Sequence, residues 1–381
     1  MFFITHKRSM NPTSGPLLLL LTLLIDLVDS NSVSNSKYIK FLQDQDRLVT
    51  DLLANYSLIQ SPIYTLADRG NGSDAIPKFT VNLVSSQLKL IEISDPEELA
   101  TFLFDFTASW IDPRLTWNPD DYGGIELLYL PVSKVWVPEM TVVDCTKSKT
   151  FMPDNMRNVW ITPNGNVSFY EIELISVICE MDVFRFPMDQ QTCSVNVIYY
   201  SYTSAQYQIN ATFGQLVRDV EESGNGEWVM KSLQIGSFSV IDNSSVVYQF
   251  QATMKRNPGF YVVLVIIPAY FINALSIIAL FCNTGSLKEK FEIGLTNIMS
   301  MSFIMVILSN DLPKTRNIPL LAIYVLISLA IMLGAMGTVL LIPKIKLRFG
   351  FFEKLRRFKI EYIIVVIFQL ANFINFIVLF L

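Results

Sequence analysis

The sequence predicts an immunoglobulin-like extracellular β-sandwich with an N-terminal helix, followed by a four-helix transmembrane bundle. Three observations lead to this fold class: a leader-like N-terminus, a turn-rich first half with alternating polar and apolar residues, and a second half built from long apolar runs. Hydrophobic residues make up 51% of the 381 positions, so membrane segments are expected.

Residues 1–30 have the order of charge and hydrophobicity typical of a cleaved signal peptide. Lys7 and Arg8 precede an apolar run that begins near Pro16, and small residues follow near Ser30. An uncleaved membrane anchor is the alternative, but Asp26 interrupts the run and no second flank follows. The mature N-terminus is therefore expected outside the cell.

Residues 31–257 are predicted to form the extracellular sandwich. Residues 35–56 have the mixed three- and four-residue apolar spacing of a helix. In residues 101–110 the period changes to two, which is typical of a half-buried strand. One face of this strand would carry Phe102, Phe104, Phe106, Ala108 and Trp110, and the other would carry Thr101, Asp105, Thr107 and Ser109.

Five Asn-X-Ser/Thr acceptors for N-linked glycans all precede residue 258, which agrees with an extracellular first half. Asn11 is disqualified by Pro12. The five acceptors are Asn55, Asn71, Asn166, Asn210 and Asn243.

Residues 258–381 are predicted to be the transmembrane domain. Four apolar runs are long enough to cross a membrane core of roughly 30 Å at about 1.5 Å per residue. They cover residues 260–281, 291–309, 319–342 and 360–381. The link at 343–359 is rich in Lys and Arg and belongs in the cytoplasm, so both termini are expected outside.

The second run differs from the other three, which are apolar on nearly every side, because it contains Glu292 and several hydroxyl and amide residues. Intramembrane carboxylates normally face a bundle interior or a water-filled path. Steps of four and three residues place six side chains on one helical stripe, polar at both ends and apolar in the middle: Glu292, Thr296, Met299, Phe303, Val306 and Asn310. Several copies around an axis would form a pore; a helix packed inside a single-chain bundle is the alternative.

An enzyme is not expected. The only histidine is His6, inside the leader, and no phosphate-binding loop, serine elbow or zinc-ligand spacing is present. No metal or cofactor is predicted. Of the four cysteines, Cys179 and Cys193 enclose thirteen residues and are expected to pair, with two free buried thiols as the alternative, while Cys145 has no evident role.

Several fragments, in this order, resemble the Cys-loop or pentameric ligand-gated ion channels, closest to the cation-selective nicotinic acetylcholine receptor-like branch. They are "WIDPRLTWNPDDYGGIE", "VWVPEM", the Cys loop with "FRFPMD", "KRNPGFYVVLVIIP" and "KEKFEIGLTNIMSMS" followed by "NDLP". The resemblance covers nearly all of the mature chain. It implies a plasma-membrane channel of five like or related subunits, in contact with lipid, opened by a small-molecule agonist and not bound to nucleic acid.

The resemblance also implies how binding reaches the pore. Phe186, Pro187 and Asp189 of the Cys loop would meet the segment around Pro313. Arg256 takes the family's arginine before the first span and is expected to bond to a carboxylate such as Asp189. An ordinary surface ion pair is the alternative.

Cation selectivity is predicted from the charged residues at the cytoplasmic mouth of the pore. Glu289 matches the family's selectivity-ring glutamate, and the Pro-Ala insertion of anion-selective relatives is absent from "SLKEKFE". Rings of Glu289 and Glu292 would concentrate permeant cations. Glu292 departs from the family, which has a small hydroxyl residue there, and because crowded carboxylates raise one another's pKa, pH-dependent conductance or divalent block is expected. Met299 replaces the family's usual leucine, which preserves the apolar ring but makes it softer. The alternatives are an anion channel and a non-conducting binding receptor.

The family's aromatic ligand box is mostly missing. Tyr200 holds the principal aromatic position, but the other matching positions are Val143, Asp105 and Ser245. Asp105 lies on the polar face of its strand and would meet a cationic ligand at a subunit interface or be solvated. Tyr202 and Tyr248 are further candidates. The agonist class stays open among amines, amino acids, amphiphiles and protons, as does the choice between a homomer and a heteromer.

Overall fold

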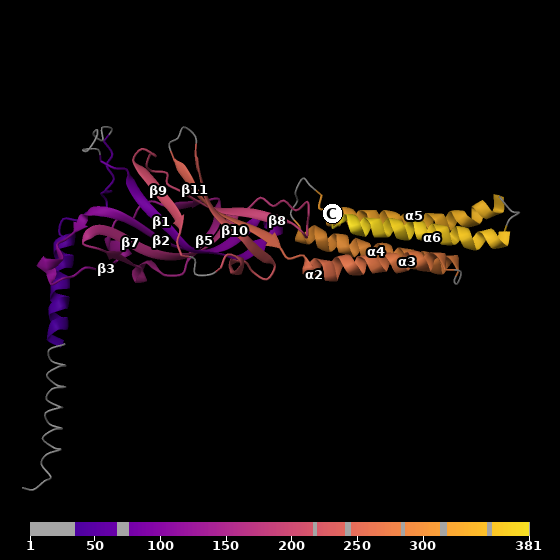
Figure 1. The fold of residues 1–381 in the computed structure, drawn as a ribbon, viewed down its shortest axis with the longest axis horizontal. Coiled ribbons are helices and arrows are strands. Elements are labelled where there is room, and N and C mark those ends of the chain that lie inside the picture. Colours follow the sequence, from indigo (N-terminus) through magenta and orange to yellow (C-terminus); the bar gives the residue numbers. More distant parts are fainter. Residues whose placement is uncertain are drawn as a thin grey trace, which may run out of the picture. The chain divides into compact units, whose positions relative to one another are not determined.

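The computed structural model describes residues 35–66, 76–215, 219–240, 245–282, 286–312, 318–348 and 353–380 (Figure 1). The predicted signal peptide, the acceptors Asn71 and Asn243, and Pro313 lie outside these ranges, and so do the side chains of the predicted cytoplasmic link. The chain divides into two compact units, which are described separately. The first consists of Met1–Phe79, Ser109–Val137 and Asp154–Phe169, and the second of Thr80–Ala108, Pro138–Pro153 and Tyr170–Leu381.

The first unit contains the expected N-terminal helix, over residues 35–53, and one end of a sheet. Strand β3 (Leu128–Pro131) pairs antiparallel with β6 (Asn158–Ile161), which pairs with the start of β7 (Asn164–Ile178). The buried ring of Trp110, near the end of β2 (Leu99–Thr116), lies edge-on to Trp136 and Phe169, with centroid distances of 6.5 and 6.0 Å. These aromatic contacts form the core of the unit.

The second unit contains the rest of this sheet and a second sheet. The first continues in the order β7-β2-β1-β9, with β5 (Cys145–Thr150) on β7, β1 at Phe79–Ser94 and β9 at Tyr207–Phe213. The second sheet has the order β10-β11-β8-β4. Its strands are β10 (Trp228–Ser239), β11 (Val246–Arg256), β8 (Gln190–Ile198) and β4 (Thr141–Val143).

Phenylalanines fill the space between the two sheets of the second unit. Phe104 of β2 and Phe250 of β11 are fully buried, with ring centroids 5.1 Å apart, and Phe213 of β9 lies edge-on to Phe250 at 5.5 Å. The predicted apolar face of β2 is buried along its whole length, which confirms the period-two pattern. The prediction of a half-buried strand was wrong for Thr101 and Asp105, which are also buried because partners from neighbouring strands cover them.

The disulfide between Cys179 and Cys193 is formed, as predicted. It joins the residue after β7 to the middle of β8, where Cys193 lies opposite Ala252 of β11. Both half-cystines are buried. The closed loop between them therefore leaves the sandwich from its core and returns to it.

The described C-terminal region has four helices that are long and apolar enough to cross a membrane: Gly259–Phe281, Leu287–Asp311, Leu320–Leu341 and Glu361–Val378. The first combines α2 (Gly259–Tyr261), a π-helical turn (Val262–Ile266) and α3 (Ile267–Phe281), and the others are α4 (Leu287–Asp311), α5 (Leu320–Arg348) and α6 (Glu353–Val378). Helix α4 begins four residues before the predicted 291, because Ser286 caps it.

The bundle is held by apolar contacts and by buried amides. Ile277 and Leu280 of α3 pack with Met332 and Met336 of α5. The side-chain amide of Asn273 (α3) donates to Asn372 (α6) at 2.9 Å, and that of Asn375 (α6) donates to the Tyr324 carbonyl of α5 at 3.0 Å. The side chains of all three asparagines are buried. The expectation of spans that are apolar on nearly every side missed these amides, which join α6 to two neighbouring helices.

The disulfide supplies a test of the fold. Replacing both Cys179 and Cys193 with serine is expected to lower the free energy of unfolding by about 3 kcal/mol, because a closed loop of this size restricts the unfolded chain. Thermal unfolding of the purified protein, with and without reductant, measures this loss. The double variant Cys145→Ser and Cys282→Ser, which removes the free thiols, is the control, and an equal loss in this control would contradict the assignment.

Candidate functional site

One face of α4 carries the predicted pore stripe. All six stripe residues are exposed in the single chain, with Met299, Phe303 and Val306 at 61%, 64% and 58%. The opposite face is buried and consists of Gly294, Asn297, Met301 and Leu308. Helix α4 therefore packs through its back and leaves the stripe uncovered by its own chain.

Two contacts fix the buried back of α4. The Asn297 side chain donates to the Ile272 carbonyl of α3 at 3.2 Å. A Cβ on Gly294 would collide with the Met336 sulfur of α5, so a larger residue there would require the Met336 side chain to move. These contacts determine the rotation of α4 about its own axis.

The hydroxyl groups along α4 bond within the helix. Thr296 donates to the Glu292 carbonyl at 2.8 Å, Ser300 to the Thr296 carbonyl at 3.0 Å, and Ser302 to the Ile298 carbonyl at 2.8 Å. Such bonds to the preceding turn satisfy the hydroxyl proton without help from water.

The first two turns of α4 hold Glu289 and Glu292. Glu289 forms a capping box: its carboxylate accepts the Ser286 N–H at 3.2 Å, and its own N–H donates to the Ser286 hydroxyl at 3.4 Å. Glu292 lies 3.9 Å from the Lys288 ammonium, with both side chains largely exposed. This exposed pair contributes little to stability, so Glu292 is available to other charges.

A second site centres on Arg256, at the end of β11. Its guanidinium donates to both carboxylate oxygens of Asp189, from Nε at 2.9 Å and from Nη2 at 3.3 Å. It also donates to Asp95 at 2.7 Å and bonds to Glu227. The expected bond between Asp189 and Arg256 is present, and it is a buried pair rather than an ordinary surface pair.

Aromatic rings and burial complete this cluster. The guanidinium carbon lies 4.1 Å from the Trp228 ring and 4.8 Å from the Phe186 ring, and the Phe186 ring lies edge-on to Tyr261 of α2 at 4.7 Å. Burial opposes a charge on Arg256, but hydrogen bonding to Asp189 and the neighbouring carboxylates raise the pKa of the guanidinium.

Asp95 is the weakly held member of the cluster. Burial raises its pKa to about 6, and the Arg256 charge only partly offsets this effect. One carboxylate oxygen of Asp95 is buried and has no hydrogen-bond partner. Three carboxylates share one guanidinium here, so a proton on Asp95 would relieve excess negative charge.

The Cys loop also contacts the membrane helices. The carbonyl of Phe184 accepts the N–H of Leu320, the first residue of α5, at 2.8 Å. Gln191 donates from its amide to Asp189 at 2.7 Å and to the Asp182 carbonyl at 2.9 Å, so it joins the two sides of the loop. Pro187 is buried, and the predicted contact with Pro313 falls outside the described residues.

The predicted ligand residues come from several elements, and most of them are engaged within the chain. Tyr200 is 62% exposed in the loop after β8. Tyr202 stacks on Tyr207 at 5.5 Å, and the Tyr248 hydroxyl accepts the Ile209 N–H at 3.2 Å. Val143 pairs with Asn196 in the second sheet, and the backbone carbonyl of Ser245 accepts the Val240 N–H at 2.9 Å.

Asp105 differs from the expectation of a solvated or interface carboxylate. Only 4% of its surface is exposed. Its two carboxylate oxygens accept hydrogen bonds from the Ser86 hydroxyl at 2.8 Å and the Tyr170 hydroxyl at 3.2 Å. Its negative charge is therefore satisfied within the chain.

Sequence reasoning missed Glu139, which positions the Tyr200 loop. Its carboxylate accepts the N–H groups of Tyr200 and Ser201 at 3.0 and 3.1 Å. Burial opposes ionisation, but the hydrogen bonds from Ser201 and Tyr200 prevail and lower the pKa of Glu139. The motif "VWVPEM" pointed to this glutamate, whereas no local signal connected Asp95 or Glu227 with Arg256.

The glycan acceptors inside the described ranges lie at the surface to different degrees. Asn55 and Asn210 are exposed and Asn166 is half-buried. Cys145 and Cys282 are free thiols. Within the described part of the chain, no group of three or more His, Cys, Asp or Glu residues is arranged to hold a metal ion.

Comparison with known proteins agrees with this arrangement. The family described as the neurotransmitter-gated ion-channel ligand binding domain matches residues 45–258. Acetylcholine receptor subunit beta-type acr-2 of Caenorhabditis elegans is 25% identical over 302 residues, which are 79% of this chain and 51% of the relative. Proton-gated ion channel subunit pbo-6 of the same organism is 24% identical over 250 residues, which are 63% and 59% of the two chains.

The 5-hydroxytryptamine receptor 3A of Mus musculus is 25% identical over 311 residues, covering 78% of this chain and 60% of the receptor. The chain thus spans between about half and three fifths of the length of these relatives. The family match covers more than half of the chain, and this chain also has a disulfide-closed loop and, after it, four helices long and apolar enough to cross a membrane. This chain belongs to the neurotransmitter-gated ion-channel family, the Cys-loop receptors.

Proposed function

We propose that this chain is a subunit of a pentameric, ligand-gated cation channel of the plasma membrane, with both termini extracellular. Four further subunits of the same or a related kind complete the pore, lipid surrounds the outer helices, and a small-molecule agonist binds between neighbouring sandwiches. The carrying observation is the exposed α4 stripe from Glu292 to Asn310.

A polar stripe that its own chain leaves uncovered must face lipid or water. Facing lipid, Glu292 would lose its hydration without a compensating buried partner. Around a shared axis, the same face lines an aqueous path, with carboxylates at one end and Met299, Phe303 and Val306 as an apolar constriction. The exposure of the whole stripe supports the second arrangement.

Cation selectivity rests on the carboxylates of the first two turns of α4. Glu289 and Glu292 are three residues apart, about 4.5 Å along the helix axis. Five copies of each would create a negative potential at the mouth that attracts permeant cations and repels anions. Of the three relatives compared above, two are named for neurotransmitters and one as proton-gated.

The Arg256 cluster supports a role in coupling. Asp189 belongs to the Cys loop, Asp95 follows β1, and Arg256 ends β11 immediately before α2. One guanidinium therefore connects three segments near the start of the membrane helices. Agonist-induced movement of the sandwich would reach α4 and α5 through these segments.

Two alternative functions are each opposed by a specific observation. An anion channel would need a positive or neutral inner mouth, which two carboxylates per chain oppose. A non-conducting binding receptor would need no polar stripe on a free helix face.

Ion-substitution electrophysiology tests the proposal. Agonist-evoked reversal potentials should follow sodium and not chloride. Glu289→Gln should lower the ratio of cation to anion permeability by about fivefold or more, since each carboxylate lost about 4 Å from a cation costs about 1 kcal/mol and a homomeric channel loses five. Ser286→Ala is the control, because it removes the helix cap but keeps the charge. Reversal potentials that follow chloride would refute cation selectivity.

Glu292 should determine how strongly divalent cations block the channel. Glu292→Gln is expected to abolish voltage-dependent block by divalent cations, because the ring loses its charges. Lys288→Gln removes the nearby ammonium without touching the carboxylate and should retain the block. Unchanged conductance and block in Glu292→Gln single-channel records would place this residue outside the pore.

Asp95 should make stability depend on pH. Its pKa is about 6 in the folded protein against 3.8 for the free group, so the stability that its protonation provides is complete below about pH 4 and is lost as the pH rises through 6. The wild type loses this stability as the pH rises, whereas Asn does not titrate. Relative to the wild type, the free energy of unfolding of Asp95→Asn should therefore increase by about 1–3 kcal/mol between pH 5 and 7.5. Thermal unfolding across this range measures the difference. Parallel curves would argue against it, and Glu97→Gln, an exposed neighbour, is the control.

A further inference from the structure

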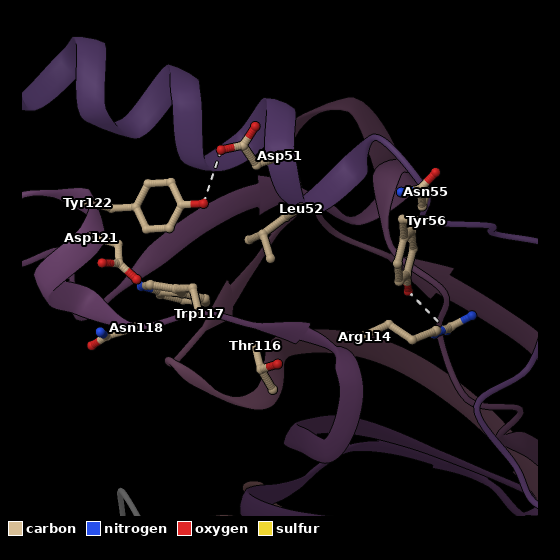
Figure 2. A pocket seen from close by; sticks show the side chains of 10 residues that line it. All are labelled: Asp51, Leu52, Asn55, Tyr56, Arg114, Thr116, Trp117, Asn118, Asp121 and Tyr122. Carbon is tan, nitrogen blue, oxygen red and sulfur yellow. Dashed lines mark hydrogen bonds between the residues drawn. The ribbon is translucent and has the colours of Figure 1, made fainter.

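A pocket of about 490 Å³ lies within the first compact unit. Its walls come from the end of the N-terminal helix, the end of β2 and the 3-10 helix η3 (Pro119–Tyr122), as Figure 2 shows. This volume falls in the range of roughly 300–1,000 Å³ that is typical of small-ligand sites. Neither the pore nor the agonist site proposed above uses it.

The lining combines one indole ring with many polar groups. Trp117 donates its indole N–H to the Ile125 carbonyl at 2.7 Å, so its ring surface is what remains for a ligand. Carboxylate, hydroxyl and amide groups surround it, from Asp51, Asp121, Thr116 and Asn118. Small-molecule pockets are mostly apolar, whereas a sugar presents C–H groups on its face and hydroxyl groups on its edge, which match an aromatic ring set among hydrogen-bonding groups.

Positive charge is already supplied at this site by the chain. Arg47 lies 5.1 Å from the centre of the Tyr122 ring and donates to the Asp121 carbonyl at 2.6 Å. Arg114 is paired with the buried carboxylate of Asp112, at 2.7 Å. Of these two arginines only Arg114 lines the pocket, together with the carboxylates of Asp51 and Asp121, so the lining carries both signs of charge and suits a neutral ligand that forms hydrogen bonds.

Asn55, one of the predicted glycan acceptors, lines this pocket and is exposed. Its neighbours in the acceptor triplet are fixed. The Tyr56 hydroxyl donates to Asp112 at 3.0 Å and accepts the Trp136 N–H at 3.0 Å, while Arg114 donates to the Ser57 carbonyl at 3.2 Å. The backbone on both sides of the Asn55 amide is therefore held at the rim of the pocket.

We propose that this pocket is the seat of the chain's own N-linked glycan on Asn55, whose inner sugars extend from the Asn55 end along the pocket toward Trp117 and Asp121 at its other end. The inference rests on the proposed extracellular location of the sandwich. Attachment occurs during synthesis, when the Asn55 Nδ2 bonds to C1 of a lipid-pyrophosphate-linked oligosaccharide. The amide loses one proton and the lipid pyrophosphate leaves. Folding then brings the attached sugar to the pocket.

Glycosidase protection tests the proposal on the full chain made in secretory cells. Glycopeptide mass spectrometry first establishes occupancy at Asn55, and Ser57→Ala should abolish it. The amidase that removes N-linked glycans should then cleave Asn55 at least about tenfold more slowly than Asn210 in the native protein, as expected for roughly 1.4 kcal/mol of protection. The two sites should be cleaved equally after denaturation.

A pair of adjacent substitutions separates the pocket from its surroundings. Asp121→Ala removes a carboxylate that lines the pocket and should raise the native cleavage rate at Asn55, whereas Asp120→Ala, exposed on the same 3-10 helix but outside the lining, should not. An unmodified Asn55 in a chain that carries a glycan at Asn210 would overturn the proposal. So would equal native cleavage at the two sites, or equal effects of Asp120→Ala and Asp121→Ala. Absence of glycan at every acceptor would instead refute the extracellular location.

Discussion

Helix α4 is constrained on one side only, and the proposed channel depends on that asymmetry. Asn297 bonds to α3 and Gly294 lies close to Met336 of α5, so rotation of the helix would break a hydrogen bond and disturb this packing. The face that remains free has carboxylates at one end and large apolar side chains in the middle. A chain folded in this way is incomplete in a membrane, because its stripe satisfies neither lipid nor water alone. Symmetric assembly resolves the mismatch, since each copy offers the same surface to a common axis.

The Arg256 cluster shows why a buried charge is retained despite its cost. Removing an arginine and two carboxylates from water is expensive, and a well-packed apolar group is often as stable. The geometry here instead joins segments that are distant in the sequence, since Asp95 and Arg256 are separated by 161 positions.

Much of this arrangement could be predicted from the sequence, because its determinants are local. The period-two pattern of β2, the thirteen-residue Cys loop and the apolar length of each span depend on neighbouring residues. The α4 stripe also followed from helical spacing. Burial of Asp105 could not be predicted, because Ser86 and Tyr170 lie on other strands. The contacts of Asp95 and Glu227 with Arg256, and the amide pairs inside the bundle, likewise depend on tertiary structure.

The serine and threonine side chains of α4 have a mechanical consequence. Thr296, Ser300 and Ser302 each tie a hydroxyl to the backbone one turn earlier. A carbonyl that accepts a second bond holds its own amide partner less tightly, and helices with such bonds bend more readily at that level. The softened turns lie directly beside Met299. In the proposed pore, a small change in the curvature of α4 near Met299 would tilt the C-terminal half of each α4 helix away from the axis. The ring of Met299 side chains would then widen without any helix unwinding.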